Sequence, residues 1–526
     1  MGVQGNADEI LGTKDNNHYE RVGLEATAED IVLSNGDRRK QHQQGGGKST
    51  DTKKYVMACA LFASFNSVLM GYDVGVMSGA IIFIQKDLHI SEFQEEILVG
   101  ILSIISLLGS LAGGRTSDAI GRKWTVALAT VVFQSGAAIM ALAPSFEALM
   151  IGRLLAGIGI GFGVMIAPVY IAEIAPSVAR GFLTSFPEIF TNLGILLGYI
   201  SNYVFSGMSV HTGWRVMLGV GILPSVFMVA ALFVIPESPR WLVMKNRIDE
   251  ARTVLLKTNE SEVEVEERLA EIQVAAKLAN SEKNGAKDVW RELLNPSPAV
   301  RRMLITGCGI QCFQQITGIE ATVYYSPTIF QEAGINGDAQ LLAATVAVGF
   351  TKTMFILVAI LLIDKVGRKP LLYVSTVGMT ISLLCLSLTL TFMGDGQLGI
   401  GLAILSVCAN VAFFSVGIGP ICWVLSSEIY PLRLRAQASA LGAVGSRVSS
   451  GAVTMSFFSV SRAITVGGTF FVFSMISALS VVFVRTCVPE TKGKTLEEIE
   501  ALFQNEGEWQ RGEVELGDVE RLVPKA

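Results

Sequence analysis

The sequence predicts an all-α membrane protein of twelve transmembrane helices arranged as two six-helix bundles. Of its 526 residues, 51% are hydrophobic and only 17% are charged, whereas roughly a quarter of the residues of a soluble domain are charged. Many apolar runs reach the roughly 20 residues that a helix needs to cross a bilayer. In addition, three short motifs of the first part of the chain recur in the same order in the second.

The predicted spans are apolar runs that lie between charged or turn-rich breaks. They cover residues 55–84, 97–114, 124–143, 147–171, 182–205, 214–236, 302–330, 340–363, 370–393, 397–427, 437–460 and 464–487. The sixth and seventh spans are separated by a stretch that is dense in Lys, Arg and Glu. Its acidic, helix-favouring composition predicts short amphipathic helices rather than a folded domain. We therefore expect a tail over 1–52, bundles over 53–236 and 301–488, a linker over 237–300 and a tail over 489–526.

The basic residues of the short loops predict the orientation of the chain, because Lys and Arg are retained on the cytosolic side. With both termini inside, the outer loops hold little beyond Lys86 and Arg462. The inner loops then hold Arg115, Arg122, Lys123, Arg180, Lys365, Arg368, Lys369, Arg433 and Arg435. We expect cytosolic termini, no cleavable signal peptide, and a place in the plasma membrane rather than the vacuolar membrane.

The chain repeats itself at a nearly constant spacing. Gly121-Arg122-Lys123 recurs 246 residues later from Gly367, Glu173 to Pro176 recurs 255 residues later from Glu428, and Pro236-Glu237 recurs 253 residues later from Pro489. Three ordered repeats predict two halves of common design. Two such halves with a binding site between them are typical of rocking transporters.

These motifs resemble those of a known family. The run from Gly114 to Lys123 is similar to the loop signature of the major facilitator superfamily. Its sugar-porter branch is indicated by Arg153 with Gly157 and by the runs Pro236–Arg240, Gln314–Gly318 and Pro489–Gly493. The resemblance covers residues 55–500. Ser185–Glu188 and Thr317–Ala321 are most similar to plant polyol transporters.

Charged residues gather at the inner ends of the spans in matching places of both halves. Opposite charges there can latch the halves together while the binding site faces outward. Single exposed pairs contribute only about 0–1 kcal/mol, which suits a latch that opens in every cycle. The alternative is that these charges anchor helices at the lipid headgroups. The predicted gate comprises Asp118, Arg122, Glu173, Arg180, Glu237, Arg240, Asp364, Arg368, Glu428, Arg435 and Glu490.

An acidic residue, Asp73, lies inside the first predicted span, where a charge is costly and indicates function by default. Its place along the span puts it at a depth similar to that of Arg153 in the antiparallel fourth span. A carboxylate that loses its cation in a dry cavity binds a proton, and regaining the cation expels it. With an acidic residue at this position, the chain resembles the proton symporters of the family. The alternative is a structural salt bridge near the membrane edge.

The substrate site is expected between the halves near the midplane. Gln311, Gln314 and Gln315 place three amides on the seventh span, and buried amides need hydrogen-bond partners. The resemblance adds Tyr324 on the same span and Trp423 after Pro420, which is expected to break the tenth span. The alternatives are amides that bond only to neighbouring helices and a Trp423 that only packs in the core.

Two residues depart from the common sugar-porter pattern. Glu188 stands where the family commonly has glutamine, and Glu320 where it commonly has asparagine; Arg447, beside Ser446, is a further charge inside a span. Our hypothesis is that Arg447 neutralises one acid, while the other is protonated or bonded to substrate. A carboxylate accepts hydrogen bonds from hydroxyls more strongly than an amide does, which favours linear polyols or cyclitols as substrates. The alternative is a structural ion pair that has no effect on substrate preference.

The resemblance thus implies a proton-coupled symporter of polyols or monosaccharides that works by alternating access. A uniporter of the same fold and a sugar sensor that moves nothing are the alternatives. We expect a monomer without nucleic-acid partner, metal or cofactor, and not an enzyme. The run Gly45–Ser49 lacks the leading glycine of a phosphate loop, because His42 takes that place.

Overall fold

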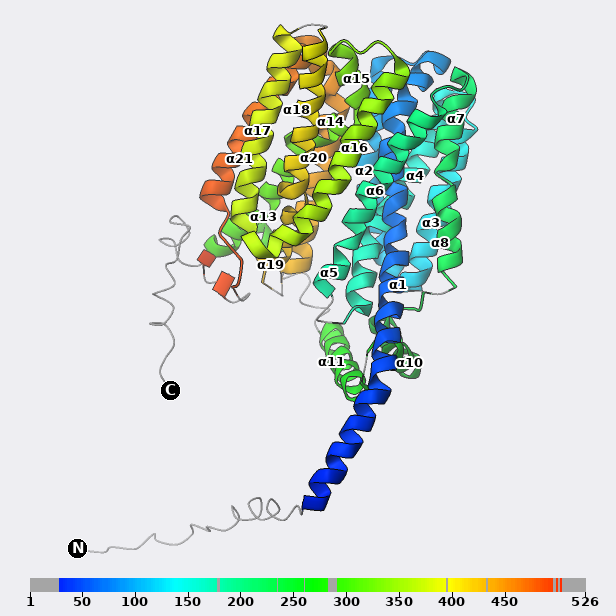
Figure 1. Ribbon diagram of the computed structural model, residues 1–526, viewed down its shortest axis with the longest axis vertical. Coiled ribbons are helices and arrows are strands. Elements are labelled where there is room, and N and C mark those ends of the chain that lie inside the picture. The colour runs from blue at the N-terminus through cyan, green and yellow to red at the C-terminus, as the bar shows by residue number, and fades with distance from the viewer. Residues whose placement is uncertain are drawn as a thin grey trace, which may run out of the picture. The chain divides into compact units, whose positions relative to one another are not determined.

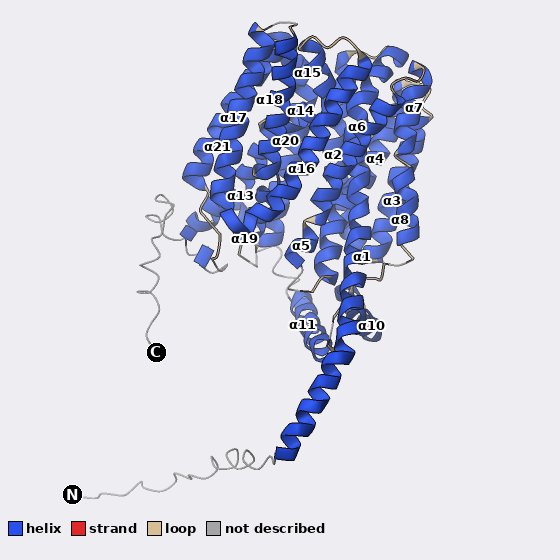
Figure 2. Ribbon diagram, in the orientation of Figure 1, coloured by secondary structure: helices blue, strands red, loops and turns tan. Residues whose placement is uncertain are grey.

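The computed structural model describes residues 28–176, 180–233, 235–259, 261–281, 291–393, 396–431, 434–494, 498–499 and 502–503. Throughout these ranges the regular structure is helical (Figure 2). The chain divides into two compact units, Met1–Lys54 and Tyr55–Ala526. In the first unit, the residues from 28 onward form the start of α1. All that follows concerns the second unit.

The helices of the first half follow the predicted spans closely, except that two spans are interrupted. Their bounds are α1 Ala28–Leu88, α2 Glu92–Ile120, α3 Arg122–Ala141, α4 Phe146–Ile174, α5 Arg180–Thr184, α6 Phe186–Phe205, α7 Val210–Val220 and α8 Leu223–Ala231. Proline ends or begins helices because it lacks an N–H donor. Accordingly the predicted sixth span is split just before Pro224, and the fifth just before Pro187.

The second half also contains two interrupted spans, and one of them is broken twice. Their bounds are α13 Pro298–Ile316, α14 Ile319–Tyr324, α15 Ser326–Glu332, α16 Asp338–Val366, α17 Arg368–Phe392, α18 Gln397–Val416, α19 Ile418–Glu428, α20 Arg435–Ile464 and α21 Val466–Cys487. The predicted seventh span is interrupted at Gly318, whose φ of 83° is left-handed, and again before Pro327. The predicted tenth span breaks at Gly417, three residues before Pro420.

Eight helices among the described residues are long and apolar enough to cross a membrane. They are Thr52–Leu88, Glu92–Ile120, Arg122–Ala141, Phe146–Ile174, Asp338–Ile363, Arg368–Phe392, Gln397–Ser426 and Val466–Cys487. The other predicted spans correspond to α5–α6, α7–α8, α13–α15 and α20. Three of these are interrupted, and α20 carries Arg447 in its interior.

The linker folds into short helices, as its composition predicts: α9 Pro239–Met244, α10 Ile248–Thr258 and α11 Glu262–Ser281. They share a small apolar core around Trp241, Leu255 and Leu269. The end of the bundle that carries this linker is called the linker end below, and the opposite end is called the distal end (Figure 1).

The two halves meet along two pairs of helices in the middle of the bundle, α2 with α20 and α6 with α16 (Figure 1). In the second pair, the Tyr199 hydroxyl donates to the Val323 carbonyl at 2.7 Å, and the Thr353 hydroxyl donates to the Asn192 carbonyl at 3.2 Å. The described polar contacts between the halves lie at mid-depth or toward the distal end. The structure is therefore the form of the bundle that is closed at its distal end.

Within the first half, α1 and α6 approach until their backbones touch. A methyl group on Gly71 would collide with the Thr191 carbonyl, and one on Gly75 with the Ile195 carbonyl. Glycines of α6 meet α1 in the same way. Small residues allow this close approach between helices in membranes.

Candidate functional site

The predicted charge pair in the first half is present. Arg153 Nη1 lies 2.5 Å from Asp73 Oδ2, and the two side chains are 0% and 2% exposed. Arg153 Nε donates to the Leu98 carbonyl at 2.9 Å, whereas Nη2 has no partner among the described residues. The guanidinium therefore keeps one N–H group free to bind elsewhere.

The three glutamines of α13 are buried and donate to polar groups of the second half. Gln311 Nε2 donates to the Ser426 hydroxyl at 2.8 Å, and Gln314 Nε2 donates to the Gly419 carbonyl at 2.9 Å. The Gln315 amide reaches only Gln314, at 3.4 Å. The carbonyl oxygens of Gln311 and Gln315 have no described partner. Both oxygens can therefore accept hydrogen bonds from hydroxyl groups of a ligand.

The two predicted aromatic residues differ in exposure. Tyr324 is buried at the end of α14, but the indole of Trp423 on α19 is 41% exposed in the middle of the chain's apolar region. Because α18 and α19 are separated at Gly417, the Gly419 carbonyl accepts from Gln314. Trp423 is thus not a core side chain in this form, which argues against the packing alternative.

The departures from the family pattern lie close to a cation that the sequence analysis missed. Lys352 is half-buried in the middle of α16, with its ammonium 5.9 Å from the centre of the Phe414 ring. Glu188 and Glu320 are the acids whose charges act on this ammonium. Lys352 makes no direct ion pair with a described residue, although the charges of both acids act on it.

Arg447, the predicted partner of these acids, makes no ion pair with either of them among the described residues. Instead, Glu320 accepts a hydrogen bond from the Ser450 hydroxyl of α20, and Asn192 donates to Glu188 at 3.3 Å. Ser446 is buried beside Arg447. The sequence analysis considered one base beside the two acids, and the structure adds a second base, Lys352.

Tyr324 connects the charge pair of the first half with this cluster. The charges that act on its hydroxyl are those of Arg153, Glu320, Asp73 and Arg447. The predicted proton-coupling pair and the predicted substrate residues are therefore brought together around one buried phenol. A change in charge at the Asp73–Arg153 pair therefore acts electrostatically on the same phenol as a change in charge at Glu320 or Arg447, and such interactions are stronger in low-dielectric surroundings.

At the linker end, the predicted gate residues of the first half form one buried network. Arg122 Nε and Nη2 bond to the two carboxylate oxygens of Glu173 at 3.0 and 3.1 Å. Glu237 accepts from the backbone N–H groups of Arg122 and Lys123. Arg122 also contacts Asp118, which is exposed, at 3.1 Å.

The second half repeats this arrangement. Arg368 bonds to Glu428 at 2.9 Å, Glu490 accepts from the backbone N–H groups of Arg368 and Lys369, and the Thr491 hydroxyl donates to Glu428 at 2.6 Å. The described ion pairs of this end thus lie within a half. Arg435 bonds to the Tyr430 carbonyl and Arg240 is exposed. The side chains of Arg180 and Asp364 lie outside the described part.

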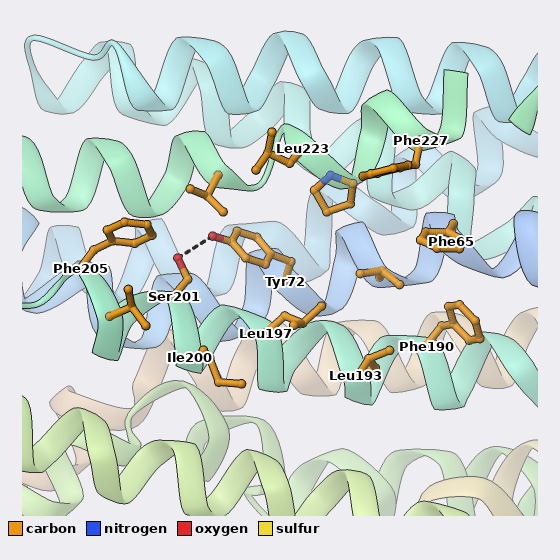
Figure 3. Close-up of a pocket in the computed structure, with 14 residues that line it drawn as sticks. Phe65, Tyr72, Phe190, Leu193, Leu197, Ile200, Ser201, Phe205, Leu223 and Phe227 are labelled. Carbon is orange, nitrogen blue, oxygen red and sulfur yellow. Dashed lines mark hydrogen bonds between the residues drawn. The ribbon is translucent and has the colours of Figure 1, made fainter. Parts of the chain in front are cut away.

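A large apolar cavity, of about 440 Å³, lies away from these groups, between α1, α6, α7 and α8 (Figure 3). Its polar groups, the hydroxyls of Tyr72 and Ser201, bond to each other at 2.8 Å. Leu197, Leu223 and Phe227 line it and are exposed. Because the cavity is lined by apolar side chains and offers no free polar group, it is not suited to a sugar.

Comparison with known proteins identifies the family. The family model described as "Sugar (and other) transporter" matches residues 59–503. The chain belongs to this family. Over 492 residues the transporter is 72% identical to the probable polyol transporter 4 of Arabidopsis thaliana, covering 94% of this chain and 93% of the relative. The predicted family and its plant polyol branch are confirmed.

Solved structures agree with this assignment. The proton:xylose symporter XylE bound to 6-bromo-6-deoxy-D-glucose matches with a TM-score of 0.71 and 29% identity, over 86% of this chain and 100% of that chain. An inward-open structure of the xylose transporter XylE from E. coli matches with a TM-score of 0.71 and 29% identity, over 85% and 99%. The major facilitator fold is confirmed, and the protein is a membrane transporter rather than an enzyme.

Proposed function

We propose that the protein is a proton-coupled symporter of polyols and of monosaccharides. The observation that carries the proposal is the fully buried Asp73–Arg153 pair beside Tyr324. It is supported by the similarity to a probable polyol transporter and to a proton:xylose symporter. We further propose the predicted orientation, with the linker end in the cytosol, and function as a monomer in the plasma membrane.

In this orientation the structure corresponds to the inward-facing state, because the halves are in contact toward the distal end. The predicted latch between the halves at the linker end is then open. Each network there, Arg122 with Glu173 and Arg368 with Glu428, holds one half together. Rocking of the two halves around the central site then gives alternating access.

Coupling follows from the chemistry of the pair. While Asp73 is bonded to Arg153, the guanidinium favours the ionised carboxylate and opposes uptake of a proton. If substrate draws the guanidinium away, the isolated carboxylate in a dry environment binds a proton. The free Nη2 of Arg153 and the shared neighbour Tyr324 make such an exchange geometrically accessible. At about 100 mV the membrane potential contributes about 2.3 kcal/mol for each charge carried.

The central cluster supports a polyhydroxylated substrate. The free carbonyl oxygens of Gln311 and Gln315 accept from hydroxyls, and Trp423 offers an apolar face for C–H groups. The charges of Glu188, Lys352 and Glu320 act on one another, and such groups form charge-assisted hydrogen bonds with hydroxyls, which are stronger than neutral ones. A linear polyol can reach more of these groups at once than a compact ring can.

The test of coupling uses the purified protein in liposomes with labelled sorbitol and an imposed pH gradient. We expect the wild type to accumulate sorbitol and a protonophore to abolish accumulation. Asp73→Asn should lose accumulation but retain exchange of labelled for unlabelled sorbitol. Glu332→Gln, a carboxyl exposed at the distal end, is the matched control. Full, pH-driven accumulation by Asp73→Asn would refute the coupling mechanism.

A second experiment tests the charged substrate site. Lys352→Met should raise the KM for sorbitol by about tenfold or more, since a hydrogen bond to a charged group contributes about 1.5–3 kcal/mol. In the double variant Lys352→Met with Glu320→Gln the net charge is restored. If the double variant regains the wild-type KM, Lys352 only balances charge and does not bind substrate.

A further inference from the structure

The distal ends of α2 and α20 are joined by an antiparallel series of contacts between the two halves. Arg462 Nη2 lies 2.5 Å from Glu92 Oε2, and Glu96 accepts from the backbone N–H of Ser459 at 2.8 Å and from its hydroxyl at 2.9 Å. Further along, the hydroxyls of Ser103 and Ser450 are 2.9 Å apart. This series, from Glu92 to Ser103, is called the distal gate below.

A second ion pair, between α1 and α16, joins the halves at the distal end with the opposite polarity. Lys86 of the first half bonds to Asp338 of the second at 2.8 Å, whereas at the distal gate the acid belongs to the first half and Arg462 to the second. Lys86 and Arg462 are the two basic residues that the charge bias of the loops left on this side. Each reaches across to the other half, so both pairs must separate when the distal end opens.

Two adjacent carboxyls are buried by this closure. Glu95 is 4% exposed and Glu96 is 2% exposed. Glu96 accepts two hydrogen bonds from Ser459, but no described residue donates a hydrogen bond to Glu95. A buried carboxylate without donor or cation is costly and is normally neutral instead.

The groups around Glu95 do not supply a cation. From its own helix it faces Glu92 and Glu96. From α20 the cation is Arg462, which is engaged by Glu92. From the segment between α14 and α15 its neighbour is Tyr325, whose hydroxyl donates to the Thr454 carbonyl at 2.9 Å. Arg462 interacts with Glu92 and Glu96, and Glu95 is the acid left without a described donor or cation.

We propose that Glu95 takes up a proton from the solution at the distal end each time the distal gate closes, and releases it to the same side when the gate opens. The proposal rests on alternating access and on the orientation proposed above, which makes this solution the external one. It makes Glu95 a proton-sensitive positioning residue of the gate, separate from the Asp73–Arg153 pair.

The direction of the effect follows from linkage. The closed form holds one more proton than the open form, so lowering the external pH favours closure, by about tenfold per pH unit for one proton. This dependence disappears once the external pH is low enough to protonate Glu95 in the open form too, where its carboxyl is hydrated. Because the proton returns to the side from which it came, Glu95 changes the rate of transport but not the ratio of accumulation.

The test measures the distance between spin labels at Leu142→Cys and Leu398→Cys, two exposed sites at the distal ends of α3 and α18. The labels are placed in a cysteine-free background that has first been shown to transport sorbitol. In the unmodified gate we expect the short-distance, closed population to grow from neutral to mildly acidic pH. Glu95→Gln should hold the gate closed throughout this range and remove the pH response.

Two controls make the outcome specific. Glu147→Gln, an exposed acid in the first turn of α4 at the same end, should keep the full response. Asp73→Asn should also keep it while losing accumulation in liposomes, which separates a failure of this inference from a failure of the coupling mechanism. The inference is overturned if the wild-type distances ignore pH, if Glu95→Gln retains the response, or if only Glu96→Gln abolishes it.

Discussion

The two ends of the bundle use charged residues in opposite ways. At the linker end, Arg122 pairs with Glu173 and Arg368 with Glu428, so each pair lies within one half. At the distal end, Lys86 pairs with Asp338 and Arg462 with Glu92, so each pair joins the two halves. The first kind makes each half a rigid body, and the second kind holds a particular conformation.

The two ends also differ in how deeply their ion pairs are buried. The Arg122–Glu173 pair is buried, whereas the distal pairs Lys86–Asp338 and Arg462–Glu92 are largely exposed. Breaking a buried pair leaves an uncompensated charge, but an exposed pair contributes little to stability. Permanent contacts are therefore the strong ones, and contacts that must open in every cycle are the weak ones.

The largest effect is expected at the linker end. Arg122→Met leaves Glu173 buried without its cation, and we expect a loss of stability of about 3–5 kcal/mol, measured by thermal unfolding in lipid nanodiscs. Arg240→Met, at an exposed arginine of the same end, should change stability by no more than about 0.5 kcal/mol. Equal losses in the two variants would contradict the distinction between permanent and transient charges.

An intermediate effect is expected at the glycines that begin α3 and α17. Gly121 and Gly367 have φ of 102° and 110° with ψ of 165° and 164°, a region that is essentially restricted to glycine, so alanine is strained at both positions by about 1–3 kcal/mol. At Gly121 the added methyl would also collide with the Glu237 carboxylate. We expect Gly121→Ala to unfold at a lower temperature than Gly367→Ala, and Gly207→Ala, which has open space around it, to match the wild type.

The smallest effect on stability is expected at the distal end. Lys86→Asp should change unfolding by less than about 1 kcal/mol, yet it places two acids opposite each other across the halves. We therefore expect the closed population of the label pair at positions 142 and 398 to fall several-fold. The double exchange Lys86→Asp with Asp338→Lys should restore it. If the double variant stays open, the pair does not hold the distal end closed.

Much of the fold and the charge pair was predictable from the sequence. Span order and the repeated motifs predict two similar halves, and counting residues along antiparallel spans places Asp73 and Arg153 at one depth. The structure confirms that these two side chains pair. Spacing alone did not predict where helices break within spans, although Gly318 and Pro327 carry the signals for the breaks around α14.

The residues that sequence analysis missed are those whose role depends on the other half. Lys352 stands alone inside a strongly apolar run, and that run hid the signal that any ionisable residue inside a span carries. Lys86 and Arg462 were counted only as exceptions to the charge bias. Glu95 precedes the predicted second span, which begins at residue 97, so its burial against α20 depends on a long-range contact that no local pattern encodes.

The contact between α1 and α6 has a consequence for coupling. Asp73 lies between Gly71 and Gly75, whose neighbours on α6 leave no room for even one methyl group. Helices in such backbone contact do not slide or turn against each other without losing it, so the Asp73 carboxyl stays at a constant position in the first half. In the proposed mechanism, separation of Asp73 from Arg153 then comes from the two side chains or from movement of α4, and not from movement of α1 against α6.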